Sequence, residues 1–184
     1  MKEKDNFKLD VVSVCLSNER PLISDEKIDS PEAAIKLVGE VLKKADREIV
    51  CVLNLQADSR PINCSFVSMG TLAYALVEPR ELLKSSFLSN AAQVLLVHCH
   101  PSGNLMPSKA DVVITDRMRQ VCEMAGIPLV DHVIVGGDND KYFSIREKCP
   151  IAFETREHYA TDYNEIKWGI VAERGDKNGG IYTR

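Results

Sequence analysis

Continuous apolar runs and apolar residues at helical spacing alternate along most of this chain of 184 residues. The runs are short, rich in β-branched residues and bounded by turn residues, which is typical of strands. A short turn separates the runs at 48–55 and 62–68, so we expect them to form a hairpin. The first of the two is apolar on both faces and should be buried. The predicted strands are 11–16, 48–55, 62–68, 94–100, 129–135 and 142–145.

Three other segments place apolar residues three or four positions apart, which predicts amphipathic helices at 30–45, 79–90 and 109–125. The first opens with Ser30 as N-cap and Pro31 at the first helical position. Because strands and helices alternate, the predicted class is α/β, a mixed β-sheet flanked by helices. The residues predicted to face the core from the helices are Ile35, Val38, Leu42, Leu82, Leu83, Phe87, Ile114, Met118, Val121 and Ala125.

The two ends of the chain lack this patterning. We expect residues 1–9 to be a disordered N-terminus, 10–149 to form one domain, and 150–184 to be a polar C-terminal tail. Trp168 belongs to the only apolar cluster of that tail. The tail is either disordered or folded back, or it binds a partner. Its polar composition favours the first interpretation, since little apolar surface is available to offset the ordering entropy.

Composition narrows the class of protein. The apolar fraction of 45% is enough for a sizeable core, and a net charge of −4 argues against a surface that coats nucleic acid. No apolar run reaches the roughly 18 residues of a membrane span, and the charged N-terminus has no apolar segment behind it, so we expect a cytoplasmic protein. No Cys-x-x-Cys pair occurs, which leaves zinc ribbons unsupported. The six cysteines are Cys15, Cys51, Cys64, Cys99, Cys122 and Cys149.

The candidate chemistry lies at the end of the strand at 94–100. Side chains two apart on a strand share a face, so His98 and His100 can point at one place while Cys99 faces the other way. Asp111 follows after a turn, and two histidines with one carboxylate are a ligand set for catalytic zinc. The alternatives are two hydrogen-bonded structural histidines, and a helix capping box formed by Ser108 and Asp111.

The spacing His98-x-His100, seven residues, then Ser108-x-x-Asp111 resembles the JAMM signature, also called JAB or MPN+, of zinc metallopeptidases and isopeptidases. The sequence around these residues is most similar to the RadC-like branch of that family. The resemblance implies a three-layer, cytidine-deaminase-like arrangement and hydrolysis of a peptide or isopeptide bond. Cys99 departs from the family, which usually has Asn there. Further similar stretches are 68–72, 79–81, 89–92 and 131–136.

The resemblance also implies roles for individual residues. His98, His100 and Asp111 would hold Zn²⁺, Glu48 would be the general base, and Ser108 would stabilise the tetrahedral intermediate. Without the resemblance, Glu48 is simply a solvated strand end. Spacing leaves Glu40, Glu78 and Glu81 as competing bases, and Asp131 and His132 as either partners of the ligands or local structural groups.

The partner implied by this assignment is a protein or peptide substrate. The runner-up function is a nucleic-acid-associated factor, because RadC-like proteins carry a DNA-repair name, although the sequence has no basic stripe. A third alternative is a metal-free scaffold built on the same fold, against which the intact ligand set argues.

Overall fold

The computed structural model describes residues 13, 16, 22–42, 45–69, 78–136, 141–153, 170–171 and 182–183. Contacts divide the chain into two units, Met1–Glu154 and Thr155–Arg184. In the second unit the described residues are an antiparallel pair of short strands, β6 (Ile170–Val171) and β7 (Tyr182–Thr183). The first unit holds the candidate chemistry.

The first unit is built on a five-stranded mixed sheet with the order β2-β1-β3-β4-β5. Neighbouring strands are antiparallel except β3 and β4, which are parallel and are connected through α3. The strands are β1 (Ile49–Leu55), β2 (Pro61–Met69), β3 (Gln93–His100), β4 (Leu129–Gly136) and β5 (Tyr142–Ser144). The helices are α1 (Pro31–Leu42), α2 (Pro79–Leu88), α3 (Lys109–Met124), α4 (Ile145–Lys148) and the 3₁₀ helix η1 (Pro150–Phe153).

Local signals in the sequence explain where the helices begin and end. The Ser30 hydroxyl accepts a hydrogen bond from the Ala33 amide at 3.2 Å, which caps α1. Pro79 opens α2, where its missing N–H costs nothing. Gly126 follows α3 with a φ of 70°, the left-handed conformation that favours glycine after a helix. The three predicted helices and the predicted hairpin of β1 and β2 are therefore confirmed.

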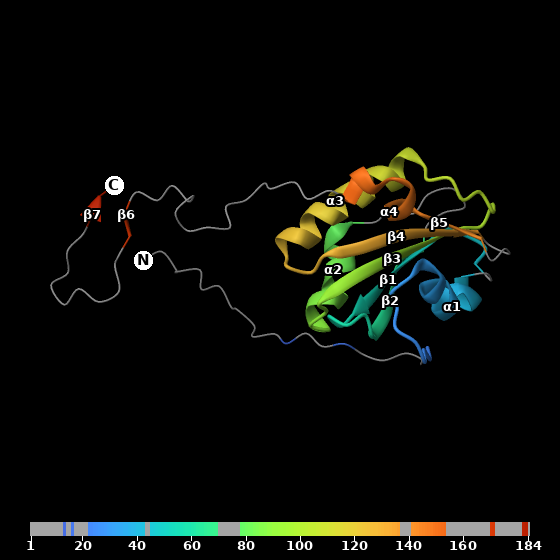
Figure 1. Cartoon of the computed structure of the whole chain (residues 1–184), viewed down its shortest axis with the longest axis horizontal. Helices are drawn as coiled ribbons and strands as arrows, with labels where there is room; N and C mark the ends of the chain where they lie inside the picture. The colour runs from blue at the N-terminus through green and yellow to red at the C-terminus, as the bar shows by residue number, and fades with distance from the viewer. Residues whose placement is uncertain are drawn as a thin grey trace, which may run out of the picture. The chain divides into compact units, whose positions relative to one another are not determined.

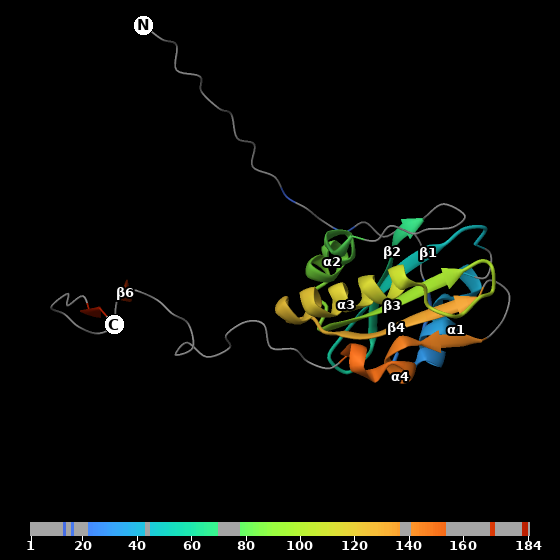
Figure 2. The same ribbon diagram turned by 90° about the horizontal axis from the view of Figure 1, so that it is seen from above.

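Alternate side chains of β3 enter two separate cores. Leu95, Val97 and Cys99 pack in the core beneath α1, whereas Val94 and Leu96 pack beneath α2 and α3. Figure 1 and Figure 2 show the resulting layers, with α1 on one side of the sheet and α2 and α3 on the other. The predicted α/β class with a mixed, helix-flanked sheet is confirmed.

Some expectations need correction. Phe87 was predicted to face the core, but it is 55% exposed, because the buried stripe of α2 runs through Leu82, Leu83 and the small Ser86. The segment after β5 forms α4 and η1, which the sequence did not predict, and Ile145 belongs to α4 rather than to a strand. The expected strand at 11–16 lies outside the described residues except for positions 13 and 16, which are not in a strand. The expected N-terminus 1–9 lies outside them entirely.

The helices can be compared with the length and apolar character that a membrane span requires. Within the described ranges, none of them is long and apolar enough to cross a membrane.

Asp131 fastens the last part of the unit to the sheet. Its buried carboxylate accepts hydrogen bonds from the Ser144 hydroxyl at 2.6 Å, the Arg146 amide at 3.0 Å and the His132 amide at 2.7 Å. Ser144 in turn accepts from the Glu147 amide and caps α4. Asp131 therefore has a structural role at the start of β4.

Replacing Asp131 by alanine is expected to lower the free energy of unfolding by about 2–3 kcal/mol, because buried donors lose a charged acceptor. Asp131→Asn retains one oxygen and should cost less. Denaturant titration of both variants measures the difference. Equal stability of the alanine variant and the wild type would contradict this role.

Candidate metal centre

The two histidines end β3 on the same face of the sheet. Their rings lie at right angles, with centroids 4.5 Å apart and an interplanar angle of 83°, and their exposures are 4% for His98 and 7% for His100. Cys99, between them, is buried in the opposite core, and its thiol lies 3.5 Å from the Leu42 carbonyl oxygen. The alternation predicted from the sequence is therefore present in the structure.

Glu48 reaches the same place from the neighbouring strand. Val50 pairs with His98 across β1 and β3, and Glu48 lies two residues before Val50, so it shares the face of the histidines. Its Oε2 is 3.7 Å from His98 Nε2. One ligand atom each from Glu48, His98 and His100 all lie within 4.8 Å of one another, so these three residues could hold a metal ion.

Asp111 comes from the first turn of α3 and touches both rings. Its Oδ1 lies 3.0 Å from His98 Nδ1, and its Oδ2 lies 3.6 Å from His100 Nε2. The same carboxylate accepts the Ser108 amide at 2.6 Å, while the Ser108 hydroxyl accepts the Asp111 amide at 3.2 Å. This is the predicted capping box, and it holds Asp111 beside the histidines.

A backbone carbonyl orients His100. Its Nδ1 lies 2.6 Å from the Asn104 carbonyl oxygen, and since a carbonyl can only accept, Nδ1 carries the hydrogen. The lone pair of the neutral ring is therefore on Nε2, which faces Asp111. Metal-binding histidines commonly donate their other nitrogen in this way.

The donor set suits zinc. Both ring nitrogens of His98 are buried and make no aligned hydrogen bond to any residue that the structure describes, although two carboxylates lie nearby. Buried polar atoms without partners are uncommon in native structures and call for an explanation. A cation would supply one for His98, and imidazole nitrogens with carboxylate oxygens are ligands that zinc accepts in proteins.

Comparison with known proteins shows the family of this chain. The family model for the RadC-like JAB domain matches residues 28–149. This chain belongs to the RadC-like JAB family. A UPF0758 protein of Actinobacillus pleuropneumoniae serotype 5b is 37% identical over 124 residues, which cover 67% of this chain and 55% of that protein. A UPF0758 protein of Desulforamulus reducens is 39% identical over 121 residues, 66% of this chain and 52% of that protein. The chain thus spans about half the length of these relatives.

Asp111 and His100 of this RadC-like JAB domain shift each other's pKa values. Burial works to raise the pKa of Asp111, but its close polar contacts with His100, His98 and Ser108 outweigh burial and hold that pKa well below its usual range. The hydrogen bond with Asp111 raises the pKa of His100 above its ordinary value, against the effect of burial. At pH values below the raised pKa of His100, the protonated ring and the Asp111 carboxylate form an ion pair when no cation is bound.

Zinc uptake by the metal-free domain is expected to weaken as the pH falls through a value above 6.5, the ordinary pKa of histidine. Only neutral imidazole binds a metal, so the raised pKa of His100 lets a proton compete at higher pH. Asp111 stays ionised across this range because its pKa is lowered. Competition with a chelator between about pH 5.5 and 8.5 measures the dependence. Affinity that is unchanged down to 6.5 would contradict the ion pair.

His132 lies against the site from β4. Its ring stacks on that of His98, with centroids 5.9 Å apart and an interplanar angle of 18°, and it is 1% exposed. Burial lowers the pKa of His132 to about 3, so the ring is neutral. Among the described residues its Nε2 has no hydrogen-bond partner, and such an unpaired buried group costs roughly 1–3 kcal/mol. Of the two alternatives left open by the sequence, contact with a proposed ligand holds for His132, and a local role holds for Asp131.

The other acids that the sequence left as competing bases lie elsewhere. Glu81 pairs with Lys84 at 2.7 Å, and Glu78 lies 3.6 Å from Arg117. Glu40 belongs to α1, on the opposite side of the sheet from the histidines. The structure places Glu48 against His98.

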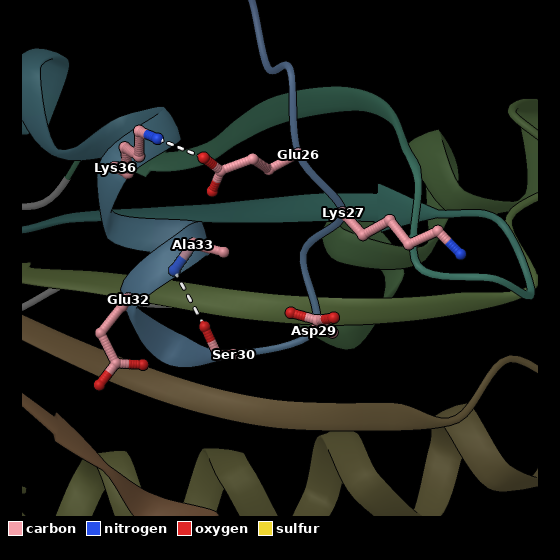
Figure 3. Close-up of a pocket in the computed structure, with 7 residues that line it drawn as sticks. All are labelled: Glu26, Lys27, Asp29, Ser30, Glu32, Ala33 and Lys36. Atoms are coloured by element: carbon pink, nitrogen blue, oxygen red, sulfur yellow. Dashed lines mark hydrogen bonds and ion pairs between the residues drawn. The ribbon is translucent and has the colours of Figure 1, made fainter.

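A separate hollow lies at the N-terminal end of α1, with a volume of about 450 Å³ (Figure 3). Lys36 and Glu26 pair across it at 2.5 Å, and both side chains are exposed. Since α1 covers the face opposite to the histidines, this hollow is not part of the candidate metal centre. Its lining residues are Glu26, Lys27, Asp29, Ser30, Glu32, Ala33 and Lys36.

Proposed function

We propose that this RadC-like JAB domain is a zinc-dependent hydrolase that cleaves a peptide or isopeptide bond with a metal-activated water. The observation that carries the proposal is the buried pair of histidines, with two carboxylates within 3.7 Å of the ring nitrogens of His98, neither of which makes an aligned hydrogen bond among the described residues. A buried N,N,O,O cluster of this kind suits a divalent cation better than a structural role.

His98, His100 and Asp111 are the proposed ligands. Zinc bound there supplies a lowered pKa for its water and a positive charge near the developing oxyanion. The chain's own contribution is to fix the ligands, because His98 and His100 lie on a strand paired on both sides and Asp111 is held by the capping box. The Asn104 carbonyl keeps His100 in the tautomer that leaves Nε2 free to bind.

Glu48 is the proposed general base. Its side chain is 18% exposed, so one side contacts His98 while the other is open to solvent and substrate. A carboxylate placed there can accept a proton from the attacking water and later transfer it to the leaving amine. The covalent change is the exchange of a C–N bond for a C–O bond, with the proton delivered to nitrogen.

Ser108 is the proposed oxyanion donor. Its oxygen accepts the Asp111 amide, which uses a lone pair and leaves the hydroxyl hydrogen available. Ser108 is exposed at the start of α3, so that hydrogen can reach a substrate carbonyl. The cap and the catalytic role therefore use different parts of one hydroxyl group.

The experiment that tests the proposal combines metal analysis with a cleavage screen. The purified full chain is loaded with zinc and incubated with linear peptides and with peptides branched through a lysine side chain. We expect about one zinc per chain and cleavage of at least one class. Failure of the folded protein to take up zinc would overturn the proposal.

A further inference from the structure

A chain of hydrogen bonds links β4 to the backbone of Asp111. The Thr115 hydroxyl lies 2.5 Å from the Asp111 carbonyl oxygen and 2.7 Å from His132 Nδ1. A carbonyl can only accept, so the single hydroxyl hydrogen of Thr115 is donated to Asp111. His132 must then donate its Nδ1 hydrogen to the Thr115 oxygen, which leaves its lone pair on Nε2.

The same ring also contacts the other side of the site, because His132 stacks on His98. One buried residue thus touches His98 through its ring face and Asp111 through Thr115. His132 and Thr115 are each 1% exposed, so neither contact competes with solvent.

We propose that His132 is a positioning residue of the candidate zinc centre. Its ring face holds the imidazole of His98 in place, and its Nδ1–H holds Asp111 in place through Thr115. This inference rests on the proposed function. His132 is not proposed as a ligand, since it contacts the site through its ring face against His98 and through Thr115. It acts through the residues that it touches.

A purely structural explanation accounts poorly for His132. Its Nε2 is buried without a partner within the described part of the chain, and an apolar ring would fill the same space without that unpaired atom. The feature that an apolar ring would lack is the Nδ1–H donor that reaches Thr115. A role in orienting the neighbours of the cation explains why this donor is present.

The test compares two variants. His132→Phe keeps a ring but removes the Nδ1–H donor, and Thr115→Val removes the hydroxyl that links His132 to the Asp111 carbonyl. Zinc and cobalt affinities are measured by chelator competition on the full folded chain. We expect both variants to bind about 10–100-fold more weakly than wild type, and Thr115→Ser, which keeps the hydroxyl, to restore most of the affinity. Cys122→Ala is the matched control, since Cys122 is buried on α3 two turns away and should leave the affinity unchanged.

Thermal unfolding of the metal-free variants separates positioning from stability. His132→Phe should unfold at nearly the wild-type temperature while its metal affinity falls, a combination that a structural role would not produce. Wild-type affinity in both folded variants would overturn the inference while leaving the proposed function intact. Failure of the wild type to bind zinc would overturn both.

A measurement on the wild type keeps the inference testable even if the variants do not fold. Nitrogen NMR of the metal-free chain reports which imidazole nitrogen of His132 carries the hydrogen. We expect Nδ1–H, and an Nε2–H tautomer would overturn the inference.

Discussion

Replacing His98 by alanine will reduce zinc in the purified protein from about one ion per chain to almost none. The imidazole lies between the two carboxylates, with Glu48 at 3.7 Å and Asp111 at 3.0 Å from its nitrogens. Its removal leaves two carboxylates and one imidazole without the group that all of them face. Elemental analysis of the full chain, after equilibration with zinc and removal of the excess, measures the loss.

Cys99→Ala is the matched control for that variant. Cys99 is the next residue of the same strand and is equally buried, but its side chain belongs to the core beneath α1. We expect this variant to keep its zinc, so a general weakening of β3 cannot account for the loss in His98→Ala. Full zinc content in His98→Ala would contradict the proposed ligand set.

Replacing Glu48 by glutamine is expected to lower the rate of cleavage by about 10²–10⁴-fold while zinc content stays the same. Glutamine has nearly the same shape, so the packing beside His98 is kept, but its amide cannot accept a proton from water. The measurement is kcat for a substrate found in the cleavage screen, together with the zinc content of the same sample.

The pair of measurements distinguishes a base from a ligand. Glu48 lies among the ligand atoms that come within 4.8 Å of one another, so direct binding of the cation is the competing assignment. Loss of zinc in Glu48→Gln would contradict the role of base. Glu81→Gln is the control, because Glu81 pairs with Lys84 away from the histidines and its replacement should leave the rate unchanged.

Most of the fold followed from local patterns. The apolar runs and the Ser30 and Pro79 start signals predicted helices and strands close to their observed bounds. Phe87 was misplaced because a helical pattern does not say which edge of an apolar stripe meets the sheet. The helix α4 has four residues, too few to show a periodicity, and it depends on the cap from Ser144, itself held by Asp131.

The site was predictable only in part. Alternation along a strand placed His98 and His100 together, and the capping box placed Asp111 at a helix start. Glu48 is 50 positions before His98 in the chain, and only the register of β1 with β3 brings the two together. The prediction of Glu48 from the sequence therefore depended on the family resemblance. The Asn104 carbonyl leaves no signal in a sequence, since every residue has one.

The capping box of α3 has a consequence for the lifetime of the site. Helix ends open and close locally at low free energy, usually without effect on function. Here the end that would open is the turn in which Ser108 and Asp111 exchange their hydrogen bonds. Each such opening would carry Asp111 away from both imidazoles, so under the proposed ligand set the fraying rate of a single helical turn would limit how long a bound cation is retained. Amide hydrogen exchange at Asp111 would then report the same event as metal dissociation.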